Sequence, residues 1–368
     1  MNCIPQLTIR TIRVRGLNLQ LARPIETASG VMNTAPLLLV DLVTNEGILG
    51  CSYLRCYTPL VLQPLVQLVA TCGEVLSGQT VAPITIGQKL QQQFRLLGTQ
   101  GLLGMALAGI DMALWDARAK ACDLPLVTLL GGEPTVIPAY GSLRRMGPEG
   151  VAQEAEELLV LGFSAFKVKI GHGDLAADLA TIRAVRQVIG QDKHLMVDYN
   201  QSLSVPEASR RLRVLDEEGL YWIEEPTRAD DFEGHARIAQ TARTAIQLGE
   251  NWWGPHEMAR SIAVHACDQA MLDVMKIGGV SGWLRAAALA EAAGLPVSSH
   301  LFPEVSAHLL GVTPTGLWLE YLNIASLILM EPLRIQDGLA TIPDRPGNGL
   351  VWDEKAVKRW LVYEAPPP

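Results

Sequence analysis

The sequence predicts an α/β barrel that follows a smaller α+β domain. Eight short apolar runs recur between residues 136 and 322, and segments with helical periodicity separate most of them. The first third of the chain mixes strand-like and helix-like patterns without this alternation. Alternating strands and helices with buried strands are typical of a parallel sheet. Eight such units within about 190 residues favour a closed barrel over an open sheet.

The first third predicts a hairpin and a long helix. Ala35–Val43 (APLLLVDLV) and the short run Ile48–Gly50 flank a polar segment, Asn45–Gly47, that suits a turn. Gly101–Ala121 is strongly apolar, and its charged residues gather in its second half, so we expect one long helix there. We see no linker rich in glycine or serine after it.

The remaining elements follow in order along the chain. The expected barrel strands are Val136–Ser142, Ala165–Ile170, Leu195–Asn200, Tyr221–Glu225, Ala245–Gly249, Ala270–Met275, Pro296–His300 and Leu317–Leu322. Expected helices between them include Gly150–Leu161, Leu175–Ile189, Pro206–Glu218, Pro255–Val264 and Gly282–Ala293. The last helix of the set is poorly marked. The final residues, rich in proline and glycine, leave the pattern, and we expect them to pack back onto the first domain. The expected domains are residues 1–133, 134–330 and 331–368.

The composition indicates a globular protein. The chain has 368 residues, a formal net charge of −8, 49% hydrophobic and 18% charged residues. Its mean hydropathy of +0.19 excludes a disordered chain. Apolar stretches such as Pro59–Ala70 and Leu322–Met330 are shorter than the roughly 18–20 residues of a membrane span. The acidic balance without basic clusters argues against nucleic-acid binding. The six cysteines form no CxxC pair and no signal peptide is evident, so we expect a cytoplasmic protein.

Ionisable residues lie at the ends of most predicted strands. They are Lys167, Lys169, Asp198, Glu224, Glu250, Asp273, His300 and Glu320. From Lys169 onward, successive members are 20 to 29 residues apart, which is about one strand-plus-helix unit. The carboxyl ends of barrel strands converge on one mouth, where barrel active sites lie. We therefore expect these side chains to form one site.

Three of these carboxylates predict a metal site. Asp198, Glu224 and Glu250 would repel one another strongly unless a cation lay between them. An all-oxygen site with open positions suits Mg²⁺. The alternative is that they form salt bridges to barrel lysines. Adjacent strand residues face opposite ways, so only one of Glu224 and Glu225 should be a ligand, and the even spacing favours Glu224.

The other strand-end residues predict acid–base chemistry. Lys167 and Lys169 face the same side of their strand, so each should depress the other's pKa and make a lysine base usable. We expect Lys169 to be that base and Lys167 to contact a substrate carboxylate; an anion-binding or structural pair is the alternative. Asp273 should orient His300, although a buried, structurally satisfied histidine is the commoner case.

Two further ionisable residues lie near the predicted strand ends, Glu320 and Lys276. Near the metal, Glu320 could be held protonated and donate a hydrogen bond to a developing enolate oxygen. The alternative is that Glu320 forms an ion pair at the exposed end of its strand. Lys276 follows Asp273 by three residues, so strand alternation predicts that it faces away from the site.

The residues that carry these features resemble the enolase superfamily and, within it, the mandelate racemase subgroup. The resemblance runs through nearly the whole chain. It is densest in Met196–Ser202 (MVDYNQS), Trp222–Thr227 (WIEEPT), Gly249–Gly254 (GENWWG), Met275–Gly279 (MKIGG) and Ser298–Leu310 (SSHLFPEVSAHLL). It implies a modified TIM barrel, (β/α)7β, beneath an α+β capping domain built from both chain ends.

The resemblance also implies roles for the strand-end residues. Asp198, Glu224 and Glu250 match the ligands of one Mg²⁺ per subunit. Lys169 matches the base on one face of the substrate's α-carbon, and His300 with Asp273 matches the base on the other. Lys167 and Ser142 match groups near the substrate carboxylate, Asn200 matches one near its α-hydroxyl, and Glu320 matches the electrophilic carboxyl.

The expected substrate pocket departs from the subgroup at one position. A mobile lid is expected at Ile25–Asn33 and a second wall at Tyr53–Tyr57. The pocket-lining candidates are Ile25, Met32, Arg55, Tyr57, Leu301 and Leu322. Racemases of the subgroup carry phenylalanine at the position of Arg55, so this arginine should either extend to solvent or meet a polar or anionic substrate tail.

Together these features predict a Mg²⁺-dependent racemase of mandelate or a close 2-hydroxy carboxylate. The alternative is an acid-sugar dehydratase on the same core, in which His300 assists departure of a 3-hydroxyl. A cycloisomerase or dipeptide epimerase is disfavoured, because those members use lysine where this chain has Asp273. A non-catalytic binding barrel is the remote alternative. The resemblance also implies a homo-oligomer, which in this family is often an octamer.

Overall fold

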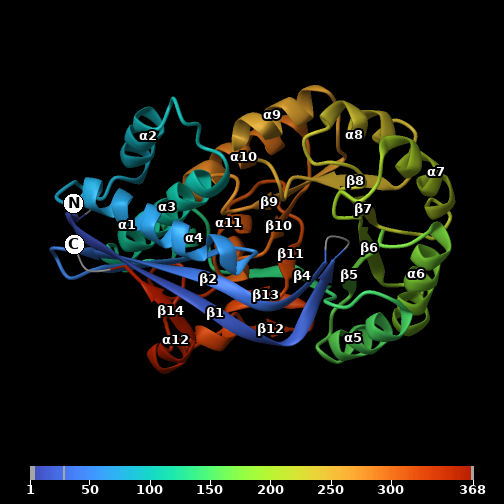
Figure 1. Cartoon of the computed structure of the whole chain (residues 1–368), viewed down its shortest axis with the longest axis horizontal. Helices are drawn as coiled ribbons and strands as arrows, with labels where there is room; N and C mark the ends of the chain where they lie inside the picture. The colour runs from blue at the N-terminus through green and yellow to red at the C-terminus, as the bar shows by residue number, and fades with distance from the viewer. Residues whose placement is uncertain (1–4, 28–29, 366–368) are drawn as a thin grey trace.

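Four antiparallel strands form the sheet of the first domain, in the order β14–β1–β2–β3 (Figure 1). They are β1 (Ile9–Thr27), β2 (Gly30–Thr44), β3 (Leu49–Arg55) and β14 (Leu361–Glu364). The computed structural model describes residues 5–27 and 30–365. The hairpin predicted around residues 45–47 is confirmed as β2–β3, whereas the sequence patterns did not predict β1.

Helices cover this sheet. α1 (Leu62–Leu76), α2 (Pro83–Gln93), α3 (Gly101–Ala121) and α4 (Leu126–Leu129) follow β3, and η1 (Pro59–Val61) precedes α1. The long helix predicted from the sequence is confirmed as α3. It lies so close to β3 that a Cβ atom on Gly50 would be 2.1 Å from the carbonyl oxygen of Ala113. Only glycine permits this approach.

By length and composition, Pro59–Leu76 is the one stretch of the described chain that could cross a membrane. It is longer than the apolar run recognised in the sequence. However, 39% of it is buried within the fold, and α1 packs on β1 and α3. Its buried side chains include Leu65 and Val69. We therefore describe it as a core helix of the first domain.

Eight parallel strands form the barrel. They are β4 (Val136–Ser142), β5 (Ala165–Lys169), β6 (His194–Asp198), β7 (Trp222–Glu224), β8 (Ala245–Leu248), β9 (Gln269–Asp273), β10 (Val297–His300) and β11 (Leu319–Tyr321). Each lies within two residues of its predicted bounds. β11 pairs with β4, and the backbone N–H of Ser299 in β10 donates to Trp318 O at 2.9 Å beside β11. These contacts close the barrel.

Seven helices connect the strands in turn. They are α5 (Pro148–Val160), α6 (Leu175–Ile189), α7 (Val205–Leu215), α8 (Phe232–Ala239), α9 (Pro255–Ala263), α10 (Gly279–Ala293) and α11 (Pro303–Leu310). A 3₁₀ turn, η2 (Ala325–Ile328), follows β11 in place of an eighth helix. The predicted (β/α)7β fold is thus confirmed.

A layer of buried side chains, most of them large, fills the barrel interior beneath the strand ends. Tyr140, Ala165, Met196, Trp222 and Met271 form this buried cluster. Each lies two residues before a predicted site residue, so both point into the barrel from the same face of the strand. The interior layer therefore supports the functional layer, which lies one step nearer the carboxyl ends.

The last part of the chain returns to both domains. β12 (Ile335–Gln336) and β13 (Leu339–Thr341) form a hairpin whose second strand runs antiparallel to β4. α12 (Glu354–Trp360) then leads to β14, which pairs with β1 in the first sheet. The domain limits at residues 133 and 330 remain predictions.

Candidate active site

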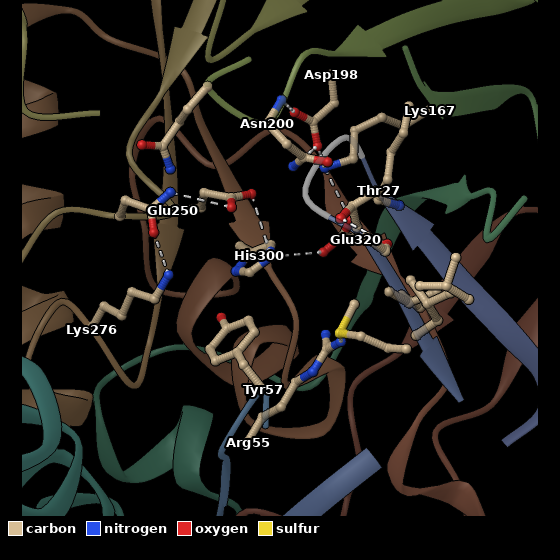
Figure 2. Close-up of a pocket in the computed structure, with 18 of the residues that line it drawn as sticks. Thr27, Arg55, Tyr57, Lys167, Asp198, Asn200, Glu250, Lys276, His300 and Glu320 are labelled. Atoms are coloured by element: carbon tan, nitrogen blue, oxygen red, sulfur yellow. Dashed lines mark hydrogen bonds and ion pairs between the residues drawn. The ribbon is translucent and has the colours of Figure 1, made fainter. Parts of the chain in front are cut away.

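The strand ends and the first domain enclose one cavity of about 550 Å³. Its barrel side includes Lys167, Lys169, Asp198, Glu250 and His300. The paired ends of β1 and β2 and the end of β3 supply its other wall (Figure 2). The site predicted from separate sequence positions is therefore brought together at the carboxyl end of the barrel.

Asp198, Glu224 and Glu250 each offer a ligand atom, and these atoms lie within 4.8 Å of one another. Burial raises the pKa of Asp198 and of Glu224, and neighbouring carboxylates raise it further while Lys167 opposes the shift. Asn200 holds Asp198 through its backbone N–H at 2.7 Å and its side-chain amide at 2.8 Å. Buried, mutually repelling oxygen donors fit a hard divalent cation such as Mg²⁺.

Glu225 lies outside this group, as strand alternation predicts. Its carboxylate accepts two hydrogen bonds from the side-chain amide of Asn251, at 2.8 and 2.9 Å.

Lys167 is surrounded by carboxylates. Its Nζ lies 3.0 Å from Glu224, 3.1 Å from Glu320 and 3.7 Å from Asp198. Although burial opposes the charge, these carboxylates raise the pKa of Lys167 well above its ordinary value. The prediction that both lysines of the pair have depressed pKa values is therefore wrong for Lys167, because its nearest neighbours are anions.

Lys169 has the opposite environment. It is buried, and its Nζ donates to the carbonyl of Leu143 at 3.1 Å. Burial and the charge of Lys167 together lower the pKa of Lys169. Both effects shift Lys169 towards its neutral form, which is the direction that a proton acceptor requires.

His300 and Asp273 form a buried pair. His300 Nδ1 lies 2.7 Å from Asp273 Oδ2, which fixes the ring with Nδ1–H donating to the carboxylate. The other nitrogen, Nε2, lies 3.4 Å from Glu250 and 4.0 Å from Glu320. Asp273 is held in turn by the backbone N–H of Met275 at 2.8 Å.

The charged groups around Glu320 favour its ionised form. Burial favours its neutral form, but Lys167 and His300 and a 2.9 Å hydrogen bond from the backbone N–H of Leu301 lower its pKa to about 2. A protonated Glu320 beside a metal-bound carboxylate stays a prediction, since the protein groups around it by themselves favour the carboxylate.

The predicted substrate-contact residues divide into two groups. Ile25, Met32, Arg55, Tyr57, Asn200 and Leu322 line the cavity. Ser142 is buried beside Lys167 in the strand register, and its hydroxyl has no partner among the described residues. Leu301 lines a smaller neighbouring cavity with Tyr53 and Phe302, so its side chain is not brought into the main one.

The backbone explains the placement of Leu301. Its φ of 52° and that of Phe302, 48°, are left-handed and turn the chain directly after β10. Tyr57, Asn200 and Glu225 also have φ values between 38° and 55°. Non-glycine residues rarely adopt this conformation, and such residues cluster at functional sites.

Lys276 also reaches the cavity, contrary to the prediction that it faces away. β9 ends at Asp273, so strand alternation no longer applies three residues later. The Nζ atom donates to the side-chain carbonyl of Asn251 and lies 5.0 Å from the centre of the Tyr57 ring. Met105 and Trp253 line the cavity as well, and no sequence pattern indicated them.

The predicted lid corresponds to the paired ends of β1 and β2. Ile25 pairs with Met32, and Thr27 with Gly30, so most of the segment is strand. Ala28 and Ser29, at its tip, lie outside the described residues. Its mobility remains a prediction.

A closed barrel with acid, base and metal-ligand side chains at one mouth, beneath a capping domain, defines a class of metal-assisted barrel enzymes. Residues 9–131 match the N-terminal domain of the mandelate racemase / muconate lactonizing enzyme family, and residues 150–356 match the enolase C-terminal domain-like family. The chain therefore belongs to the mandelate racemase / muconate lactonizing enzyme group of the enolase superfamily.

Relatives in this group catalyse different reactions. The chain is 33% identical to a 3,6-anhydro-alpha-L-galactonate cycloisomerase of Streptomyces coelicolor over 75% of this chain and 78% of that protein. It is also 33% identical to an L-talarate/galactarate dehydratase of Salmonella typhimurium over 72% and 67% of the two chains.

A solved enolase from Bradyrhizobium, complexed with magnesium and mandelic acid, is 44% identical with a TM-score of 0.93. The similarity covers 98% of this chain and 100% of that one. The magnesium cofactor predicted from the sequence agrees with the carboxylate group here and with the magnesium in that relative.

Proposed function

We propose that this enzyme is a Mg²⁺-dependent racemase of a 2-hydroxy carboxylate, mandelate or a close analogue. The observation that carries the proposal is that Lys169 and His300 line one cavity from β5 and β10. Around the barrel these strands are separated by four strands in one direction and by β4 and β11 in the other. A racemase needs such a base on each side of the reacting carbon. The mandelic acid in the Bradyrhizobium relative supports this substrate class.

Asp198, Glu224 and Glu250 would hold the magnesium ion, which supplies a Lewis acid that stabilises negative charge on the substrate's carboxylate oxygens. Lys167 places a fixed positive charge beside the same group, and its contacts with Glu224 and Glu320 hold its ammonium in place. This arrangement stabilises the enediolate that forms when the α-proton leaves.

Proton transfer is assigned to Nζ of Lys169 and Nε2 of His300. Lys169 accepts a proton because its pKa is lowered. His300 acts at Nε2 because Nδ1 is committed to Asp273. A proton removed by one base and replaced by the other inverts the carbon. A proton returned by the same base restores the original configuration.

Isotope exchange tests the assignment. The enzyme with Mg²⁺ is incubated with each enantiomer of mandelate in D₂O, and α-proton exchange and optical rotation are followed. We expect exchange with inversion. Lys169→Ala and His300→Asn should each abolish racemisation while leaving exchange of one enantiomer, a different one for each variant. Lys89→Ala and His256→Asn, on the exposed surface, are the matched controls.

The second candidate is an acid-sugar dehydratase. The buried Arg55 and the dehydratase relative from Salmonella favour it, because a polar substrate would suit a charged wall. In that reaction His300 would assist departure of a 3-hydroxyl. Formation of a 2-keto acid from a sugar acid, without racemisation of mandelate, would establish it. Absence of exchange with every 2-hydroxy acid, with and without Mg²⁺, would instead favour a binding barrel.

A further inference from the structure

The cavity contains an arginine, Arg55, whose guanidinium makes no ion pair with the residues that the structure describes. Three arginines are buried among the described residues: Arg15, Arg55 and Arg211. Arg15 and Arg211 each pair with two carboxylates, at distances of 2.6 to 2.7 Å. Arg55 is only 5% exposed and makes no ion pair with any carboxylate that the structure describes. A buried charge without a partner is costly, so its retention here indicates a ligand.

The neighbours of Arg55 leave most of its hydrogen-bonding capacity unused. One terminal nitrogen lies 3.6 Å from the sulfur of Met32, and the guanidinium carbon lies 5.0 Å from the centre of the Tyr57 ring. A thioether is a weak acceptor and a ring face accepts no directed bond, whereas a guanidinium carries five N–H donors. The Tyr57 hydroxyl is likewise buried without a partner among the described residues.

Lys276, the other cation against the Tyr57 ring, is different. Its ammonium donates to Asn251. The ammonium of Lys276 thus has a directed acceptor in the protein, whereas the guanidinium of Arg55 meets only a thioether sulfur and a ring face. In the view of Figure 2, Arg55 lies at the edge of the cavity away from Asp198 and Lys167.

We propose that Arg55 is a specificity-determining residue that binds a second carboxylate, at the end of the substrate remote from the reacting 2-hydroxy acid. The substrate is then a dianion whose distal carboxylate accepts two N–H bonds from the guanidinium, with the Tyr57 hydroxyl as a further donor. Ile25, Met32 and Leu322 line the same cavity and suit the carbon skeleton of such a molecule. The inference rests on the proposed function, which places the reacting carboxylate beside Lys167.

Binding of inert substrate analogues tests this directly. Benzoylformate and 4-carboxybenzoylformate are 2-keto acids without an α-hydrogen, so calorimetry with the Mg²⁺-loaded enzyme measures their affinity without turnover. The methyl ester of the distal carboxylate is the neutral control ligand. 2-Oxoadipate and its distal monomethyl ester form a second dianion and ester pair, with a flexible aliphatic skeleton in place of the ring. We expect at least one dianion to bind about 10- to 100-fold more tightly than its ester.

The variants isolate the contribution of Arg55. Arg55→Met should remove the preference for the dianion, and Arg55→Lys should retain part of it, because lysine keeps the charge but not the fork of donors. Arg260→Met is the matched control, since Arg260 is exposed and stacks on Phe232 at 5.2 Å outside the cavity. Arg260→Met should show the same ratio of dianion to ester affinity as the unmodified enzyme.

Two outcomes overturn the inference. One is that neither dianion binds more tightly than its ester. The other is that Arg55→Met and Arg260→Met show the same preference. Failure of the racemase proposal is separate, because it is detected as absence of α-proton exchange. The enzyme could bind the dianion more tightly than its ester in an Arg55-dependent way and yet exchange the α-proton of no 2-hydroxy acid. That result would support the carboxylate-binding role of Arg55 and refute the racemase proposal.

Discussion

Acidification should destabilise this protein through His308, a fully buried residue of α11. Its Nδ1 accepts a hydrogen bond from the backbone N–H of Val127 in α4, at 3.2 Å. The ring is therefore neutral, with its proton on Nε2. Protonation at Nδ1 would direct two N–H groups at each other and place a charge in the interface between α4 and α11. Burial lowers the pKa of His308 to about 4 from the ordinary 6.5.

The sign and size of the effect follow from this shift. The unfolded chain takes up a proton near pH 6.5 and the folded chain only near pH 4, so the free energy of unfolding falls as the pH decreases through that window. With about 1.4 kcal/mol per pKa unit, the loss from this one residue is about 2 kcal/mol between pH 7 and pH 5.

Urea unfolding at pH 7 and pH 5 measures this loss in the unmodified protein and in His308→Gln. Glutamine keeps an acceptor for Val127 and does not titrate, so the variant should lose about 2 kcal/mol less stability between the two pH values. Contributions from other groups are common to both proteins and cancel. His172→Gln, on the exposed surface, should behave like the unmodified protein. An unchanged difference between pH 7 and pH 5 in His308→Gln would refute the reasoning.

Three further predictions concern α10, α3 and the metal. Gly279→Ala should lower the free energy of unfolding by about 2–4 kcal/mol, because its φ is +74° and the new Cβ would lie 2.4 Å from Asp111 Oδ2. Gly78 has a similar φ of +79°, but no atom lies within 4 Å of the Cβ that alanine would add there. Gly78→Ala therefore measures the backbone cost alone in the same denaturation assay. Burial raises the pKa of Asp111 to about 6 from 3.8, so ionisation destabilises the fold by about 2 kcal/mol as the pH rises from 4 to 6. Asp111→Asn should lack that decrease in urea unfolding, and a decrease equal to that of the unmodified protein would contradict the assignment. Mg²⁺ at about 100 times its dissociation constant should raise the free energy of unfolding by about 2.7 kcal/mol, and a chelator should reverse the gain. Asp198→Asn should weaken the response in thermal melts, and a melting temperature independent of Mg²⁺ in the unmodified protein would exclude the metal site.

The barrel strands were predictable because both of their faces are buried. All five residues of β5 are buried, for example, so the sequence shows a short apolar run wherever a strand lies. The choice of Glu224 over Glu225 followed from the two-residue alternation within a strand, and the structure places Glu224 with the other ligand candidates. β1 escaped prediction because its arginines interrupt the apolar pattern.

The predictions failed where the chain leaves the regular strand. Lys276 lies three residues beyond the end of β9, and Leu301 follows β10 in a left-handed conformation. Alternation describes side-chain directions only within an extended strand, so it misplaced Lys276. Leu301 was expected in the pocket from the family resemblance, and its left-handed backbone turns it towards the smaller cavity. The same limit applies to Met105 and Trp253, which reach the cavity from α3 and from the loop before α9.

The sequence by itself determined the barrel, the order of its strands and the chemical types at their ends, because these depend on local periodicity and spacing. Only the tertiary structure decided how those groups affect one another. The pKa of Lys167 rises and that of Lys169 falls, although both face the same side of one strand, because carboxylates from other strands contact Lys167 alone. Arg55 has no ion-pair partner in the described part of the chain for the same reason: charge balance depends on neighbours distant in the chain, and no local pattern encodes them.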